Sequence, residues 1–215
     1  MIINNNKSAL AMAVLATLPS LVLAQTQPAQ VQSHLSLGNQ FTEVPKNGMQ
    51  SYFGGLYNNS EHKKLLGVYL DGKWQFQQKL FVQVNYDKTT RTSTTLSQGY
   101  YGLGITLPFV DDSHWFGSIG YASYKAKRET NTKPRRDNDG GGVSAETGVI
   151  IPINPHWQME TSYRFADFEG GGQHQLNWKN QILFGNHSAV EINLGYRDWQ
   201  SLNQLNYQLG YRFRF

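Results

Sequence analysis

The sequence predicts an antiparallel up-and-down transmembrane β-barrel with ten strands, or eight as the alternative count. Three observations support this fold class. Residues 203–215 alternate apolar and polar side chains without a break, and nine earlier segments show the same pattern. Residues 1–24 resemble an export signal. The chain given ends on an aromatic residue, Phe215.

The final segment shows the pattern most clearly. A strand would place its apolar side chains on one face, and these are Leu205, Tyr207, Leu209, Tyr211, Phe213 and Phe215. Apart from Gly210, the residues between them are polar. The run is longer than a typical soluble strand and has about the length that crosses a bilayer at a tilt. We therefore expect one face toward lipid and one polar, cationic face.

The N-terminus predicts a secretory signal peptide over residues 1–24. Lys7 precedes an apolar run over 9–23, which is too short for a membrane helix, and a small-residue site ends at Ala24. We expect cleavage there, so that residues 25–215 form the barrel domain. An exported barrel of this kind belongs in the outer membrane of a Gram-negative cell.

Composition excludes several classes of function. The chain has no cysteine, which removes disulfide scaffolds and thiolate chemistry. A net charge of +4 is too small to indicate a nucleic-acid partner. Metal-ligand spacings, a P-loop and a dinucleotide fingerprint are all absent, so no cofactor is expected. The 21 glycines and 13% aromatic residues suit a membrane barrel with a polar lumen.

Ten segments alternate in turn along the chain. They are residues 35–41, 66–76, 80–87, 101–109, 115–122, 143–151, 157–165, 176–184, 190–197 and 203–215. Asp71-Gly72 would ordinarily signal a hairpin, but the alternation continues through it, which favours one uninterrupted strand. Pro45 ends the first segment because proline cannot donate to a β-ladder.

The connections predict the orientation of the barrel. Tight turns are expected near residues 77, 112, 155 and 186, and long loops over 46–64 and 125–142. Short periplasmic turns and longer outer loops are typical of such barrels, and an even strand count places both termini on the periplasmic side. Aromatic residues near the tight turns would form an interfacial girdle.

The chain resembles the small outer-membrane β-barrels of the OmpA-transmembrane-domain and OmpX/Ail kind. The resemblance rests on the signal peptide, on strand pairs joined by turns such as Phe76-Gln77-Gln78-Lys79, and on the ending Tyr211-Arg212-Phe213-Arg214-Phe215. Members of this kind most often have eight strands. The resemblance implies that Tyr211, Phe213 and Phe215 form the signal read by the barrel-insertion machinery. It implies an architecture and no particular activity.

Charged side chains on the polar faces form the first candidate site. They are Glu146, Glu160, Glu191, Arg164, Lys179, Arg197 and Arg212. The interior of a barrel of eight to ten strands is only just wide enough for side chains, and charges buried there need partners. We expect the three glutamates to face the four cations and to fill the lumen with salt bridges. A narrow porin-like channel lined by the same charges is the alternative.

A basic stretch forms the second candidate site. Its cations are Lys125, Lys127, Arg128, Lys133, Arg135 and Arg136, on the loop expected over residues 125–139. Such a loop could hold the phosphates of lipopolysaccharide or another anionic polymer, or it could be a solvated loop without a ligand. Expected partners are therefore the lipid bilayer and the insertion machinery, with lipopolysaccharide as the candidate ligand of the basic stretch.

An outer-membrane hydrolase is the third reading. His62, Asp167, His174 and Asp198 fall near the expected outer rim, but no segment resembles the motifs of the barrel proteases or lipid A hydrolases. Histidines near a membrane interface are commonly polar girdle residues. We therefore expect a structural or surface-interaction protein without catalytic residues.

Overall fold

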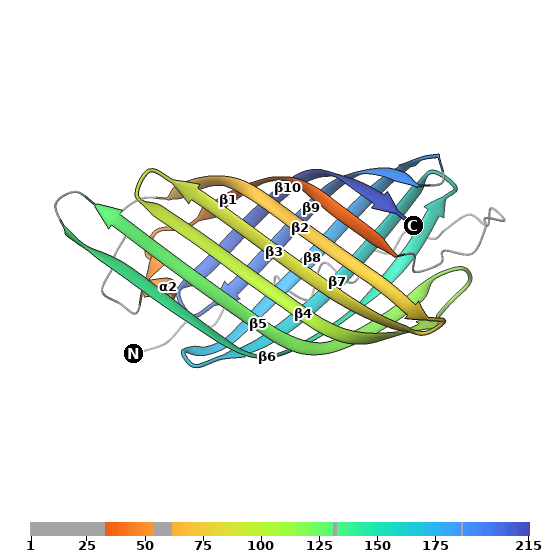
Figure 1. Ribbon diagram of the computed structural model, residues 1–215, viewed down its shortest axis with the longest axis horizontal. Coiled ribbons are helices and arrows are strands. Elements are labelled where there is room, and N and C mark those ends of the chain that lie inside the picture. Colours follow the sequence, from red (N-terminus) through yellow and green to blue (C-terminus); the bar gives the residue numbers. More distant parts are fainter. Residues whose placement is uncertain (1–32, 54–61, 131–132, 186) are drawn as a thin grey trace, which may run out of the picture.

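Ten strands close into one antiparallel barrel. The computed structural model describes residues 33–53, 62–130, 133–185 and 187–215. The strands are β1 (His34–Val44), β2 (Lys63–Gln77), β3 (Leu80–Arg91), β4 (Thr94–Pro108), β5 (His114–Thr130), β6 (Lys133–Asn154), β7 (Trp157–Phe168), β8 (Gly171–Phe184), β9 (Ser188–Trp199) and β10 (Leu202–Arg214). Each strand pairs with its neighbours in sequence, and β1 closes the barrel on β10 (Figure 1). The ten-stranded prediction is confirmed, so the alternative of eight is set aside.

Strand alternation divides the barrel wall into an apolar outer face and a polar inner face. In β1 the side chains of Leu35 and Leu37 are exposed, whereas His34 and Ser36 are buried. Strand β2 runs unbroken through Asp71, as predicted, and turns after Gln77. Because a strand places successive side chains on opposite faces, the sequence pattern alone determines which residues line the lumen.

Strand β10 closes the barrel as expected. Leu35 of β1 pairs with Phe213, and Phe41 pairs with Tyr207, with ring centroids 6.0 Å apart on the outer surface. The segment with the clearest alternation therefore pairs with both β9 and β1. Closure leaves no unpaired strand edge in the membrane, which is the condition for a sheet to span lipid.

The two ends of the barrel differ. We call the end that holds His34 and Arg214 the terminal end. It also carries the turns after β2, β4, β6 and β8, as the tight-turn prediction required. The opposite end, the α2 end, carries the connections after β1, β3, β5, β7 and β9. Only the β1–β2 connection is long at this end. Of the two long loops predicted, over residues 46–64 and 125–142, the structure therefore has only the first.

The prediction of a loop over residues 125–142 was wrong. Strands β5 and β6 run straight through it, with Lys125 paired to Asp139 and Arg128 to Arg136. Polar residues replace apolar ones there, which removes the apolar alternation used to recognise strands, while the backbone ladder continues. The candidate cations of that stretch therefore lie on a protruding hairpin of two strands (Figure 1).

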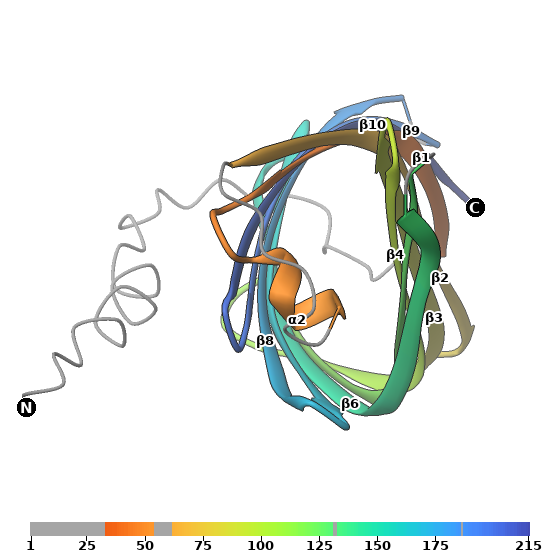
Figure 2. The ribbon, with the colours of Figure 1, turned by 90° about the vertical axis from the view of Figure 1, so that its left-hand side faces the viewer.

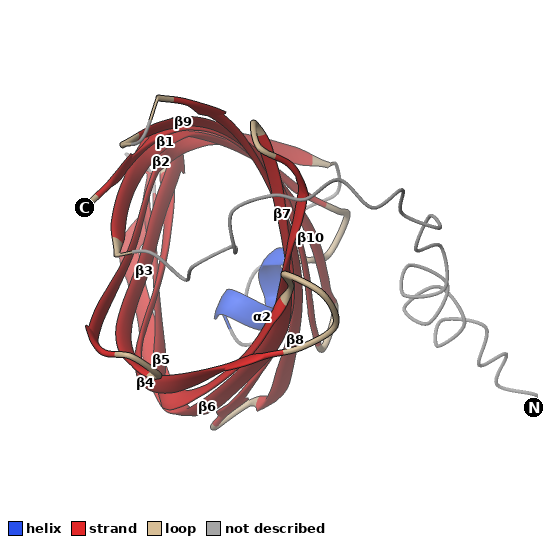
Figure 3. Ribbon diagram, turned by 90° about the vertical axis from the view of Figure 1, so that its right-hand side faces the viewer, coloured by secondary structure: helices blue, strands red, loops and turns tan. Residues whose placement is uncertain are grey.

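The long β1–β2 connection folds back into the barrel. Its described part includes the short helix α2 (Met49–Phe53), which lies within the opening when the barrel is viewed from the α2 end (Figure 2). The same helix is visible through the barrel from the terminal end (Figure 3). No helix in the described ranges has the length and apolar character to cross a membrane. The predicted signal peptide lies outside the described residues.

Candidate functional site

Seven strands direct ionisable side chains into one layer of the lumen. They are β1, β2, β3, β6, β7, β8 and β9. Strand β10 adds an eighth contribution, the side chain of Arg212. All seven predicted lumen charges lie in this interior, where they are buried or nearly so. The alternation of each strand explains their direction, and closure of the barrel brings together residues that are far apart in sequence.

Asp71 is the centre of the network. Lys179 of β8 donates a 2.6 Å hydrogen bond to its carboxylate, and the ring of His34 lies 2.9 Å from it. The guanidinium of Arg212 lies 3.7 Å away, and the amide of Asn85 also donates to Asp71. One aspartate thus connects strands β1, β2, β3, β8 and β10 across the lumen.

Glu160 extends the network toward the terminal end. It lies 3.5 Å from Lys179 and 3.8 Å from Lys73. The ammonium of Lys73 lies over the ring of Phe116 at 4.2 Å and over that of Phe81 at 5.0 Å. The two phenylalanines and Ile150 form a buried apolar cluster, so the ionic layer ends against an apolar layer on this side.

Glu146 organises the opposite wall. Arg164 donates to it at 2.7 Å, and Ser162 and Gln83 each donate at 2.6 Å. The Arg164 guanidinium also lies 3.9 Å from the ring centre of Tyr100. Both carboxylate oxygens of Glu146 are therefore satisfied, as a buried carboxylate requires.

The remaining two cations each bind a different carboxylate. Arg212 forms an ion pair with Glu191, whereas Arg197 pairs with Asp87 rather than with a glutamate. The interior ion pairs thus join five carboxylates to five cations. These are Asp71, Asp87, Glu146, Glu160 and Glu191 against Lys73, Arg164, Lys179, Arg197 and Arg212. Asp71, Asp87 and Lys73 are not among the seven lumen charges predicted from the sequence.

Two paired glycines make room for part of this network. Gly38 and Gly210 are cross-strand partners on the lumen face, and a Cβ on Gly210 would lie 2.2 Å from the hydroxyl of Tyr69. Because neither glycine has a side chain, Tyr69 can lie across both strands. Its hydroxyl donates a 3.1 Å hydrogen bond to Glu191. Glycine is required here for close approach.

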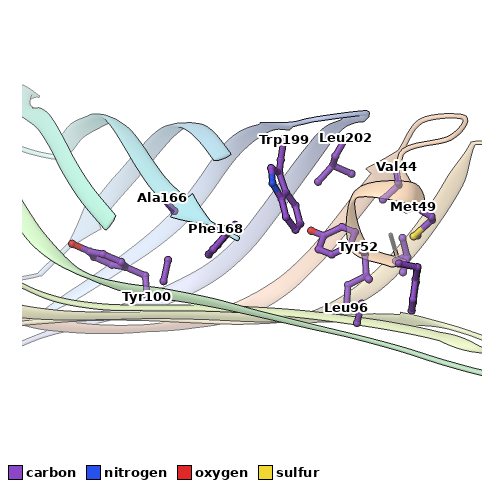
Figure 4. Packing of buried hydrophobic residues seen from close by; sticks show 13 residues of the cluster. Val44, Met49, Tyr52, Leu96, Tyr100, Ala166, Phe168, Trp199 and Leu202 are labelled. Atoms are coloured by element: carbon purple, nitrogen blue, oxygen red, sulfur yellow. The ribbon is translucent and has the colours of Figure 1, made fainter. Parts of the chain in front are cut away.

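An apolar cluster fills the lumen on the α2 side. Tyr52 of α2 packs edge-on against Trp199, with centroids 5.7 Å apart, and Phe168 packs against the other side of the same indole (Figure 4). The Tyr52 hydroxyl donates to Gln204 and accepts from Gln98, both at 2.8 Å. Burial raises the pKa of Tyr52 above its usual range, which keeps this donor protonated.

A small polar cavity lies between the ionic layer and α2. Its volume is about 50 Å³, and its lining includes Gln98, Gln175, Asn177 and Gln208. A space of that size holds only a few water molecules. The ionic layer borders the same cavity, because its lining also includes the charged side chains of Asp71, Asp87, Arg164, Lys179 and Arg197.

The other candidates lie outside the ionic layer of the lumen. Tyr211, Phe213 and Phe215 are exposed in one line at the terminal end. Lys125, Lys127 and Arg128 lie on β5, and Lys133, Arg135 and Arg136 lie on β6. His174 and Asp198 are cross-strand partners, but Nδ1 of His174 lies 2.6 Å from the Tyr163 hydroxyl. No group of three or more metal-ligating side chains occurs in the described part of the chain.

A family model describing the outer membrane protein beta-barrel domain matches residues 8–215. The chain belongs to this outer-membrane β-barrel family. That membership agrees with the closed ladder and with the apolar outer face of the barrel, and it supports an outer-membrane location in a lipid bilayer. No curated protein matches the chain.

Two solved barrels illustrate a distant likeness in fold to this outer-membrane barrel. Ail, the attachment invasion locus protein of Yersinia pestis, is 13% identical, with a TM-score of 0.44 and coverage of 86% of this chain and 98% of Ail. OprG from Pseudomonas aeruginosa is 10% identical, with a TM-score of 0.42 and coverage of 86% and 96%. Values this low carry no argument about ligand or activity.

Proposed function

We propose that this protein is a non-catalytic outer-membrane barrel with a sealed lumen, acting in the architecture of the cell surface and in contacts made there. The observation that carries the proposal is the ionic layer centred on Asp71 and Lys179, which joins opposite walls of the lumen. Apolar layers lie on both sides of it, one at Phe81 and Phe116 and one at α2.

A porin-like channel is the competing function. It would need a continuous aqueous path along the barrel axis. Opening that path would break several buried ion pairs at once, and removing one partner of such a pair costs about 3–5 kcal/mol. The small polar cavity is the feature that favours a channel, but the ion pairs that line it and the apolar cluster at α2 border it on both sides.

Liposome swelling tests the sealed lumen. Vesicles carrying the purified barrel are diluted into an isotonic arabinose solution beside vesicles with a general porin and vesicles without protein. The sealed barrel gives the swelling rate of empty vesicles. Swelling comparable to that of the porin vesicles would favour the channel.

The proposal includes an orientation, with both termini in the periplasm and the α2 end outside. Because the chain has no cysteine, a single introduced cysteine reports one position without background. Thr92→Cys, in the β3–β4 turn of the α2 end, is expected to react with a membrane-impermeant maleimide on intact cells. Gln78→Cys, in the β2–β3 turn of the terminal end, is expected to react only after lysis. The reverse pattern would invert the orientation.

Two finer points belong to the same proposal. The mature chain is expected to begin at Gln25, and the intact mass of the purified protein measures this directly.

His174 is held by Tyr163 on the outer face, and we propose no hydrolytic role for it. Hydrolysis of lipid A or of peptides that His174→Ala abolishes would overturn that assignment.

A further inference from the structure

Asn39 places an exposed amide on the outward face of β1, in the middle of the apolar surface that faces lipid. Its neighbours on the same face of β1 are Leu37 and Phe41. Its ladder partners are Val68 of β2 and Leu209 of β10. The three strands lie side by side (Figure 1). Val68 is 49% exposed and Leu209 is 58% exposed, so the amide stands among side chains that contact lipid.

Asn39 lies too deep in the membrane to reach the headgroups. On the α2 side the apolar surface of these strands ends at the ion pair between Glu43 and Lys64. Asn39 comes four residues before Glu43 on β1. At a rise of about 3.4 Å per residue and a strand tilt of about 40°, its Cα atom is roughly 10 Å farther into the membrane. Asparagine also lacks the long apolar stem with which a lysine extends its polar group to the interface.

The Asn39 amide has no hydrogen-bond partner within the part of the chain that the structure describes. Two other outward polar side chains show the contrast. The indole N–H of Trp115 donates to Thr147 at 2.9 Å, and the indole N–H of Trp157 donates to Asn180 at 3.3 Å. An unpaired amide among lipid tails is costly, because the tails offer neither a donor nor an acceptor. Asn39 therefore indicates a contact that a single barrel does not supply.

The chemistry of the amide selects the partner. In a membrane, lipid tails are as apolar as a protein surface, so a polar contact is what distinguishes a protein neighbour from lipid. An amide carries both donors and an acceptor, and it is therefore complementary to a second amide. Two copies inserted in the same direction are related by a two-fold axis along the membrane normal, and such an axis brings a residue to its own copy at the same depth.

We propose that the outward face of β10, β1 and β2 is the interface of a two-fold homodimer within the membrane. The two Asn39 amides lie at the axis and donate to each other. Leu37 and Leu209 surround the amide pair and exclude lipid from it. The contact needs neither a sealed lumen nor the proposed orientation, because the axis stays along the membrane normal in either case.

Sedimentation equilibrium of the full barrel in density-matched detergent micelles tests the dimer. The wild-type protein should show a monomer–dimer equilibrium that shifts with the ratio of protein to detergent. Asn39→Leu should weaken dimerisation about tenfold, because it removes the hydrogen bonds between the two copies. Asn180→Leu is the matched control and should leave dimerisation unchanged, since Asn180 has its partner within its own barrel.

The folding of the variant barrel separates an interface role from a role in the monomer. Asn39→Leu places an apolar side chain against lipid, so the barrel should fold at least as well as wild type, measured by heat-modifiable gel mobility. A wild-type barrel that is monomeric at every ratio would overturn the dimer and assign the face to lipid. Equal dimerisation of wild type and Asn39→Leu would overturn the amide contact.

Disulfide cross-linking in outer membranes tests which face forms the interface. Because the chain has no cysteine, Asn39→Cys gives each copy a single thiol at the axis. Copper phenanthroline should link the two copies, since the disulfide traps even a weakened dimer. Asn180→Cys, the same substitution on the outward face of β8, should stay monomeric. Absence of a link through position 39, or equal linking of both variants, would overturn the assignment of the interface to this face.

Discussion

The ammonium of Lys179 on β8 donates a 2.6 Å hydrogen bond to the carboxylate of Asp71 on β2, from the far wall of the barrel. Four ladder steps separate these strands on the shorter way around the closed sheet, through β1, β10 and β9. The bond therefore spans the lumen rather than following the wall. It joins the two sides of the barrel at the level where the ion pairs are densest.

Asp71→Asn should destabilise the barrel strongly. The substitution removes the negative charge that Lys179, Arg212 and His34 share. The buried cations then lack this counter-charge. The expected loss is about 3 kcal/mol in the free energy of unfolding, measured by urea unfolding in detergent micelles. Glu43→Gln is the control, because the Glu43–Lys64 pair is exposed and should cost less than about 1 kcal/mol.

The coupling between the two residues is tested by adding Lys179→Met. If Asp71 and Lys179 act as a pair, the double variant should be more stable than the sum of the two single losses predicts. Strict additivity would mean that the bond across the lumen contributes little, and that the single effects arise from separate contacts.

Tyr52→Ala should loosen the α2 plug. The ring packs on Trp199, whose side chain is 1% exposed, and its hydroxyl bridges Gln98 and Gln204. Loss of a buried aromatic ring costs about 3–5 kcal/mol. In a variant that keeps Trp199 as its only tryptophan, acrylamide quenching should rise with Tyr52→Ala. Tyr52→Phe, which keeps the ring, should leave quenching nearly unchanged. Equal quenching in all three forms would contradict the packing of α2 on Trp199.

Phe215→Ala should affect assembly and not stability. Phe215 is 63% exposed at the end of β10, where it stacks on Phe213 at 6.2 Å, so its loss leaves the lumen intact. We expect unchanged unfolding in detergent and less heat-modifiable barrel in the outer membrane of expressing cells. Phe76→Ala, another exposed aromatic at the terminal end, should accumulate normally. Equal accumulation of both variants would remove the proposed role of the final aromatic in insertion.

Alternation predicted most of the fold because lipid imposes it. Leu35 and Phe213 could be assigned to the outer face from spacing alone, and their pairing followed from closure. The prediction failed at residues 125–142, where polar side chains replace the apolar face although the β5–β6 ladder continues. Helix α2 was also missed, since Met49–Phe53 is too short to show helical periodicity.

The lumen was predicted in composition and not in its pairing. Spacing placed Glu160 and Lys179 on inner faces, but which cation meets which carboxylate depends on strand register and on distances across the barrel. The central position of Asp71 could not be read from the sequence, because it depends on which strands closure places across the lumen. Arg197 pairs with Asp87 because closure brings β9 and β3 to the same depth.

Single-channel recording in planar bilayers tests the sealed lumen most directly. Purified barrel is inserted under an applied voltage in concentrated potassium chloride, with heat-modifiable gel mobility confirming that the inserted protein is folded. A lumen closed by the Asp71–Lys179 layer and by α2 should give no conductance steps above those of the protein-free bilayer. Regular, reproducible steps from the folded wild-type protein would contradict the sealed lumen and establish a channel.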